Sequence, residues 1–202
     1  KKALDEFPAF IPESETEKHA ARTKVENTYI EVVFEMGRCT YWEARTYDKG
    51  SKEAKSALQK ASAEFTDMYE RTRNNAGGKF ARLWQGKCFE ELDQITQALG
   101  VYEDLLTLTP DTPVKATLYD LSLRFKLICL NHEQKKDYPL VVTLAEEWLG
   151  MFRDRARTEA GYGIEWELCR AFEKLGTDSS KSETERSQAL NQALTHARAL
   201  SR

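Results

Sequence analysis

The sequence is poor in the residues that break helices. Among 202 residues there are 10 glycines and 5 prolines, which is few for a chain of many turns and argues against an all-β architecture. Long hydrophobic runs are missing too, since the longest, such as residues 139–145, fall far short of the ~20 residues that span a bilayer. We therefore expect long helices and no membrane span. The aromatic content of 10% excludes a disordered chain.

Charge and cysteine spacing exclude two further classes. The 30 Lys and Arg residues nearly balance the 33 Asp and Glu residues, giving a net charge of −3, so we expect no nucleic-acid partner. Cys39, Cys88, Cys129 and Cys169 form no CxxC pair, which argues against zinc and thioredoxin-type sites. Each lies in an apolar helical stretch and is expected in the core. Reduced thiols favour a cytoplasmic location, and a bacterial cell envelope stays open as an alternative.

Apolar residues recur every three or four positions in eight segments, which is the spacing of an α-helix. Capping-box signatures at Ser14–Glu17 and Ser182–Glu185 open the first and last of them. Pro113 suits a first helical position, and residues 74–78 are expected to form a loop. Residues 1–13 contain two X-Pro steps and predict an extended lead-in. No segment predicts a strand, so the fold class is all-α.

One segment follows a repeat pattern. Gly86 and Phe89 are followed by Ala98, Tyr102 and Pro110. This spacing resembles the tetratricopeptide repeat (TPR), a helix pair in which small residues allow close packing and aromatics fill the space between pairs. The cysteines support a repeat of this length, since they are separated by 49, 41 and 40 residues.

The resemblance is incomplete. Arg82 and Gln85 stand where a TPR has Trp and Leu, and Trp84 is displaced by two positions. The first pair is longer, because 24 residues separate Gly37 from Ala61. Divergent repeats of this kind are similar to those of bacterial multi-repeat scaffolds.

The resemblance implies a right-handed α-α superhelix of about four TPR-like helix pairs over residues 14–202. The expected pairs cover residues 14–76, 77–111, 112–153 and 154–202. We expect the chain to be a fragment of a longer array, because the last helix leaves Leu190, Leu194 and Leu200 without a partner. These leucines are expected to be exposed, or covered by a second copy that associates through this C-terminal open edge.

No motif predicts catalysis, a cofactor or a metal site. The segment Gly77–Phe80 has Phe where a phosphate-binding loop needs Ser or Thr. His132 and Glu133 lack the second histidine of a zinc helix, because position 136 is Lys. Adjacent acids such as Glu90 and Glu91 point about 100° apart on a helix. We expect a protein that is not an enzyme.

The remaining hypothesis is protein–protein interaction. In the TPR register, the first helix of each pair lines a concave face that holds a peptide or a partner helix. The expected groove residues are Phe34, Arg38, Tyr41, Trp42, Phe80, Leu83, Lys87, Glu90 and Glu91. Tyr41 and Trp42 could instead pack against the neighbouring pair. Too few cations lie here for a clamp on a C-terminal carboxylate. A self-assembly module and a docking or regulatory domain of a larger enzyme are the alternatives.

Overall fold

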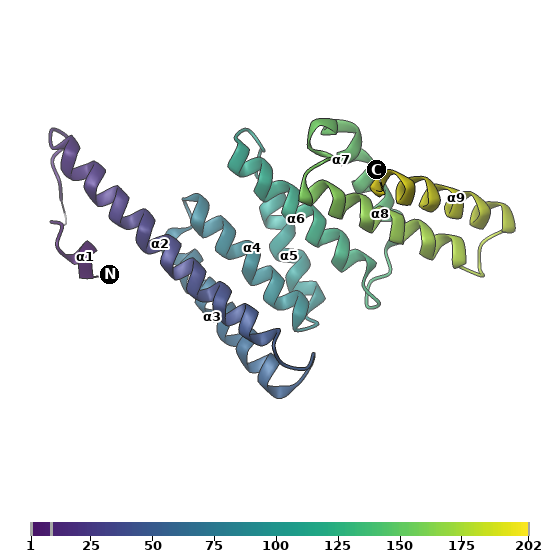
Figure 1. Ribbon diagram of the computed structural model, residues 1–202, viewed down its shortest axis with the longest axis horizontal. Helices are drawn as coiled ribbons and strands as arrows, with labels where there is room; N and C mark the ends of the chain where they lie inside the picture. Colours follow the sequence, from purple (N-terminus) through teal and green to yellow (C-terminus); the bar gives the residue numbers. More distant parts are fainter. Residues whose placement is uncertain (1, 9, 202) are drawn as a thin grey trace. The chain divides into compact units, whose positions relative to one another are not determined.

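The computed structural model describes residues 2–8 and 10–201 and divides into two compact units, Lys1–Leu92 and Asp93–Arg202 (Figure 1). No strand occurs in the described ranges, which confirms the all-α prediction. The helices of the first unit are α1 (Lys2–Asp5), α2 (Thr16–Ala44), α3 (Lys52–Thr72) and α4 (Ala76–Glu91). Those of the second are α5 (Ile95–Leu106), α6 (Pro113–Asn131), α7 (Tyr138–Met151), a 3-10 turn (Arg153–Arg155), α8 (Glu159–Thr177) and α9 (Glu183–Leu200).

In the first unit, α3 packs against both α2 and α4, and α2 also contacts α4. The first half of α2 extends past the end of α3, and the short α1 lies against it (Figure 1). Small residues allow the close approach of α2 and α3: a Cβ on Gly37 would lie 2.8 Å from Cε1 of Phe65. Phe65 is the largest buried residue of α3 and lies in the core of this unit.

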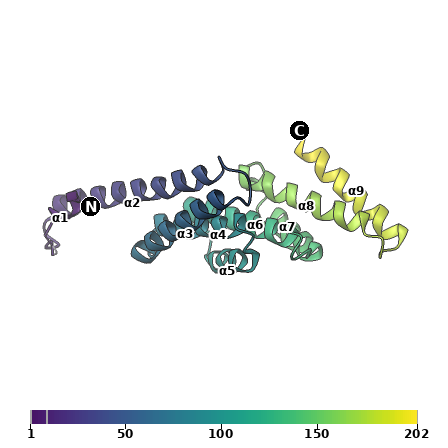
Figure 2. The same ribbon diagram turned by 90° about the horizontal axis from the view of Figure 1, so that it is seen from below.

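In the second unit, each helix packs against its neighbours in the chain, and α6 also contacts α8. Figure 2 shows α8 and α9 side by side and antiparallel. The core is built around Trp148, Ile164 and Leu168, all almost completely buried. A first helix that contacts the next first helix, with the intervening helix packed on both, is the arrangement of helical repeats.

Two buried polar pairs stabilise the core of the second unit. The indole Nε1 of Trp148 donates a hydrogen bond to Asp120 at 2.8 Å, and Arg155 lies 3.4 Å from the same carboxylate oxygen. Burial raises the pKa of Asp120. The amide of Asn131 donates to the carboxylate of Glu167 at 2.8 Å, which also receives Arg170. Each of these buried side chains therefore has at least one polar partner, as burial requires.

The boundary between the units falls inside the predicted pair 77–111, so its two helices, α4 and α5, belong to different units. Asp93, at this boundary, has a left-handed φ of 64°. Its side chain accepts a hydrogen bond from Gln134 at 2.8 Å and lies 3.1 Å from Nε2 of His132. These contacts tie the start of the second unit to the turn between α6 and α7.

The helix ends differ from the predictions in three places. The capping box predicted at Ser14 is wrong: the N–H of Glu15 donates to the carbonyl of Pro12, and α2 begins only at Thr16. The predicted loop at 74–78 is shorter, because Asn75 caps α4 and Gly78 is already helical. Residues 2–5 of the predicted extended segment form α1, since Phe7–Pro8 disfavours helix only at its own position.

The predicted exposure of the C-terminal edge is confirmed for Leu190 and Leu194, which are exposed, whereas Leu200 is half-buried. Among the cysteines, Cys88 and Cys129 are buried as expected. The core prediction for Cys39 is wrong, because this side chain lies on the outward face of α2 and is exposed.

Candidate partner-binding surface on α2 and α4

An aromatic cluster joins α2 to α4 in the first unit, with Trp84 at its centre. The ring of Trp84 lies 5.0 Å from Tyr41, 6.3 Å from Trp42 and 6.5 Å from Phe34, each edge-on. It also lies 6.2 Å from Phe65 in the core. Edge-to-face pairs at these distances stabilise a cluster beyond the area that they bury. Trp84 is therefore held in one position from several sides.

Two arginines cover the outer side of this cluster. The guanidinium of Arg38 lies 5.3 Å from the centroid of the Trp84 ring, and that of Arg45 lies 5.6 Å from Trp42. Both distances are within the range of cation–π attraction. We call the surface formed by Phe34, Arg38, Trp42, Arg45 and Trp84 the Trp84 surface. Along α2 it extends over ~17 Å, at 1.5 Å per helical residue.

Carboxylates neutralise the cations of the Trp84 surface. Glu35 bonds Arg38 at 2.8 Å. Glu91 accepts from both Arg45 and the hydroxyl of Tyr41, each at 3.3 Å. Burial, reinforced by the charge of Glu91, raises the pKa of the Tyr41 phenol, so it stays protonated at neutral pH. The surface is thus aromatic and close to neutral rather than basic.

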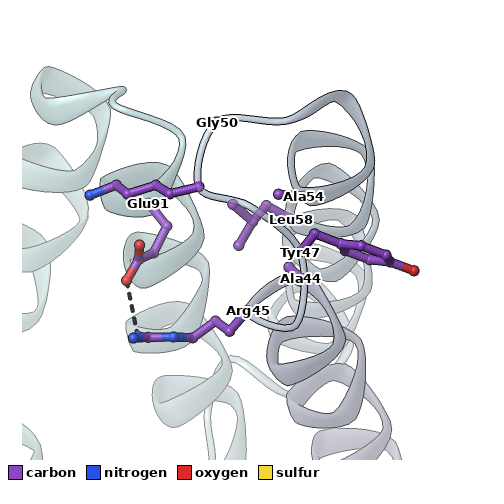
Figure 3. A pocket seen from close by; sticks show the side chains of 8 residues that line it. Ala44, Arg45, Tyr47, Gly50, Ala54, Leu58 and Glu91 are labelled. Carbon is purple, nitrogen blue, oxygen red and sulfur yellow. Dashed lines mark hydrogen bonds and ion pairs between the residues drawn. The ribbon is translucent and has the colours of Figure 1, made fainter.

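A small cavity of about 140 Å³ lies at one end of the Trp84 surface. Its apolar lining comes from Ala44, Ala54 and Leu58, and its rim from Arg45 and Glu91. Figure 3 shows Arg45 and Glu91 directed toward one another beside the cavity, whereas the ring of Tyr47 points away from Glu91. Gly50, with a φ of +81°, makes the turn that closes the other side. The cavity is large enough for one short aliphatic side chain.

The structure divides the predicted groove residues into three groups. Phe34, Arg38 and Trp42 lie on the Trp84 surface, and the Trp42 side chain is 48% exposed. Tyr41 and Leu83 are each 1% exposed, so neither offers contact area, and Tyr41 supports the ring of Trp84 from within. For Tyr41, this is the packing alternative that the sequence left open.

The remaining predicted residues lie along α4. Lys87 and Glu90 form an ion pair at 2.6 Å in which both side chains are largely buried. Glu91 is half-buried and bonded to Tyr41 and Arg45. Phe80 is half-buried and lies outside the aromatic contacts of Trp84.

Sequence reasoning missed Trp84 and Arg45 as members of the surface. Trp84 lies two positions away from the Trp of the TPR signature, so that signature does not indicate its place on the surface. The helical period does indicate that Arg45 belongs to the surface, since positions 34, 38, 41 and 45 share one face of α2. Reading the face of the helix, instead of the family motif, would have included it.

A comparison of the chain with protein-family models, with curated protein sequences and with solved structures finds no match. The site therefore has to be interpreted from its own geometry.

Within residues 2–8 and 10–201, no three His, Cys, Asp or Glu side chains come together as a metal site would require. Over the same ranges, no helix combines the length and apolar character that crossing a membrane demands. What the Trp84 surface offers is rigid aromatic area beside an apolar cavity, which suits the binding of side chains from another polypeptide.

Proposed function

We propose that the protein is a non-catalytic scaffold whose Trp84 surface holds a peptide or a partner helix. The observation that carries the proposal is the half-exposed Trp42 beside the partly buried Trp84, fixed from beneath by Tyr41 and flanked by Arg38 and Arg45. Trp, Tyr and Arg are the residue types enriched at binding hot spots. Because their positions are already fixed, little conformational entropy is lost when a partner binds.

The chemistry of the surface limits the partner. Arg38 and Arg45 are each paired with a carboxylate of the same unit, so a strongly acidic peptide would have to compete for them. The accessible groups that remain are aromatic faces and the apolar lining of the cavity. A partner with an aromatic or aliphatic anchor, and a short aliphatic side chain for the cavity, fits best.

The proposal includes TPR-like helix pairs as the scaffold. Its support is the packing inside each unit: α2 contacts both α3 and α4, and α6 contacts both α7 and α8. Small residues stand where the helices approach most closely, as Gly37 does beneath Phe65. A superhelix of such pairs, with the first helices lining its concave face, is the architecture that we propose for the whole chain.

The experiment is affinity capture from a lysate of the source cell with three proteins: wild type, Trp42→Ala and Trp166→Ala. Trp166 is the matched control, since this α8 residue is 54% exposed and lies outside the Trp84 surface. We expect a partner that wild type and Trp166→Ala retain and that Trp42→Ala loses. Retention by Trp42→Ala together with loss by Trp166→Ala would contradict the proposal and move the site to α8.

A further inference from the structure

A second surface of the first unit has no role in the proposed peptide binding. It is the outward face of α2, opposite the face that packs on α3. The residues at the centre of this face are Val25, Tyr29, Val32, Met36 and Cys39. Val32 is 52% exposed and Met36 is 61% exposed, and Cys39 is exposed as well. We call this row, with the charged residues at its two ends, the α2 seam.

The spacing of the seam is that of a coiled coil. Successive members are separated by four and three residues in strict alternation, which places them at the a and d positions of a heptad repeat. From the N-terminal end, the members are Lys18, Arg22, Val25, Tyr29, Val32, Met36, Cys39 and Glu43. Five apolar or thiol side chains thus occupy the middle of the row, while cations stand at one end and an acid stands at the other.

Within the described part of the chain, the seam is exposed at Val32, Met36 and Cys39, whereas α1 borders its N-terminal half. Pro8 lies beside its N-terminal end, where Arg22 donates to the carbonyl of Pro8 at 3.3 Å. Between α1 and α2, however, an apolar groove of about 590 Å³ remains along the seam. Its lining includes Ala3, Ala21, Val25, Tyr29 and Val32.

The distribution of charge indicates what fits this surface. In an antiparallel pair of helices, a positions face d positions. Two copies of α2 aligned in this way place Lys18 opposite Glu43 at both ends of the pair. Between those ends, Val25 faces Met36 and Tyr29 faces Val32. A parallel pair would instead bring Lys18 against Lys18 and Glu43 against Glu43. The seam is therefore complementary to itself in the antiparallel direction.

We propose that the α2 seam is an isologous interface through which two copies of this chain pair antiparallel. Lys18 and Glu43, at the two ends of the seam, are placed to form ion pairs with the second copy. Lys18 pairs with Glu15 in its own helix turn at 2.5 Å, and Glu43 accepts a weak hydrogen bond from Tyr47 at 3.5 Å. A two-fold axis repeats each contact, so every layer contributes twice. This interface is separate from the C-terminal edge formed by Leu190 and Leu194.

The first test is sedimentation equilibrium of the whole chain over a concentration series. With four apolar layers we expect a monomer–dimer equilibrium with a Kd of about 1–100 μM. Val32→Asp is expected to leave a monomer, and Leu194→Asp, at the other exposed edge, to leave the dimer unchanged. Thermal melts confirm that both variants fold. A wild-type monomer throughout the series, or dissociation by Leu194→Asp alone, overturns the proposal.

Charge reversal tests the direction of pairing. Lys18→Glu and Glu43→Lys each turn two attractions into two repulsions and are expected to weaken the dimer roughly tenfold. The double reversal restores both attractions, so its Kd should return to within about threefold of wild type. Additive weakening in the double variant overturns the antiparallel register.

A covalent trap gives an independent result. Arg22 faces Cys39 of the second copy in the proposed register, so oxidation of Arg22→Cys should yield a dimer linked between positions 22 and 39, identified by peptide mapping. Links between two Cys39 residues would show parallel pairing and contradict the proposal. Wild type, which lacks the cysteine at position 22, is the matched control.

Discussion

The guanidinium of Arg38 lies over the indole ring of Trp84, 5.3 Å from its centroid, and Glu35 bonds it at 2.8 Å from the preceding turn of α2. This relationship links the two helices of the candidate binding surface. It also explains why the surface can be aromatic and yet ordered, since the ring has the cation on one side and other aromatic rings around its edge.

Arg38→Ala is expected to lower the free energy of unfolding by about 1 kcal/mol, because a partly exposed cation–π contact is lost. Arg38→Lys should recover only part of this, since the compact ammonium lacks the flat face that stacks on an indole. Urea denaturation followed by circular dichroism measures both. Equal stability of wild type and Arg38→Ala would show that the stacked arginine contributes nothing.

Gly37→Ala should destabilise the first unit. The new Cβ would lie 2.8 Å from Cε1 of Phe65, a buried ring that cannot move aside, and overpacking of this kind costs about 1–3 kcal/mol. The matched control is Gly100→Ala in α5, where a Cβ meets nothing within 4 Å. At this position alanine is the better helix former and should raise the free energy of unfolding by about 0.5–1 kcal/mol. Thermal melts that shift in the same direction for both variants would contradict this account.

Asp120 should make stability depend on pH in the acid range. Burial raises the pKa of this carboxyl in the folded chain, so its contribution to stability is full below the ordinary pKa of Asp and is lost as the pH rises through the raised value. Asp120→Asn keeps an acceptor for Trp148 and has no charge to bury. Its stability relative to wild type should therefore increase as the pH rises from the ordinary pKa of Asp to the raised pKa of Asp120. A difference independent of pH would refute this role.

The hydrogen bond from Trp148 to Asp120 predicts what happens when the carboxylate that accepts it is removed. Asp120→Ala leaves the buried indole N–H of Trp148 without its 2.8 Å partner, which should cost about 1–3 kcal/mol. Asp120→Asn is the control, because an amide oxygen can still accept this hydrogen bond. Equal destabilisation of the two variants would show that this hydrogen bond does not account for the loss of stability.

The cysteines should react in a fixed order. Cys39 is exposed, whereas burial raises the pKa of the Cys88 thiol to about 12. The thiolate is the reactive form, so alkylation at pH 8 should modify Cys39 first and Cys88 only after unfolding. Burial also raises the pKa of Cys169, which should react more slowly than Cys39. Mass spectrometry of timed samples gives the order, and early modification of Cys88 would contradict it.

The features predictable from sequence were those fixed locally. Ser182 opens α9 with a complete capping box, because this motif needs only the residues within one helical turn. Pro113 likewise begins α6 behind its Thr112 cap. At Ser14 the same signature failed, because Pro12 accepts the N–H of Glu15 and draws residues 12–15 into a separate turn.

The candidate site was predictable only in part, because burial depends on which helices meet. Tyr41 and Trp42 are neighbours in sequence, yet one is buried and the other is half-exposed. The deciding contact is the ring of Trp84 from α4, packed 5.0 Å from Tyr41. No local pattern in α2 contains that information. The exposure of Cys39 was missed for the same reason, since the apolar character of a stretch does not say which of its faces is covered.

The most direct measurement of the central claim is the affinity of a captured partner for wild type, Trp42→Ala and Trp166→Ala, by isothermal titration calorimetry with the full chain. Loss of a hot-spot Trp costs ~2 kcal/mol or more, so we expect Trp42→Ala to bind at least about 30-fold more weakly and Trp166→Ala to bind as wild type does. Unchanged affinity of Trp42→Ala, in a variant that melts as a folded protein, would contradict the Trp84 surface as the binding site.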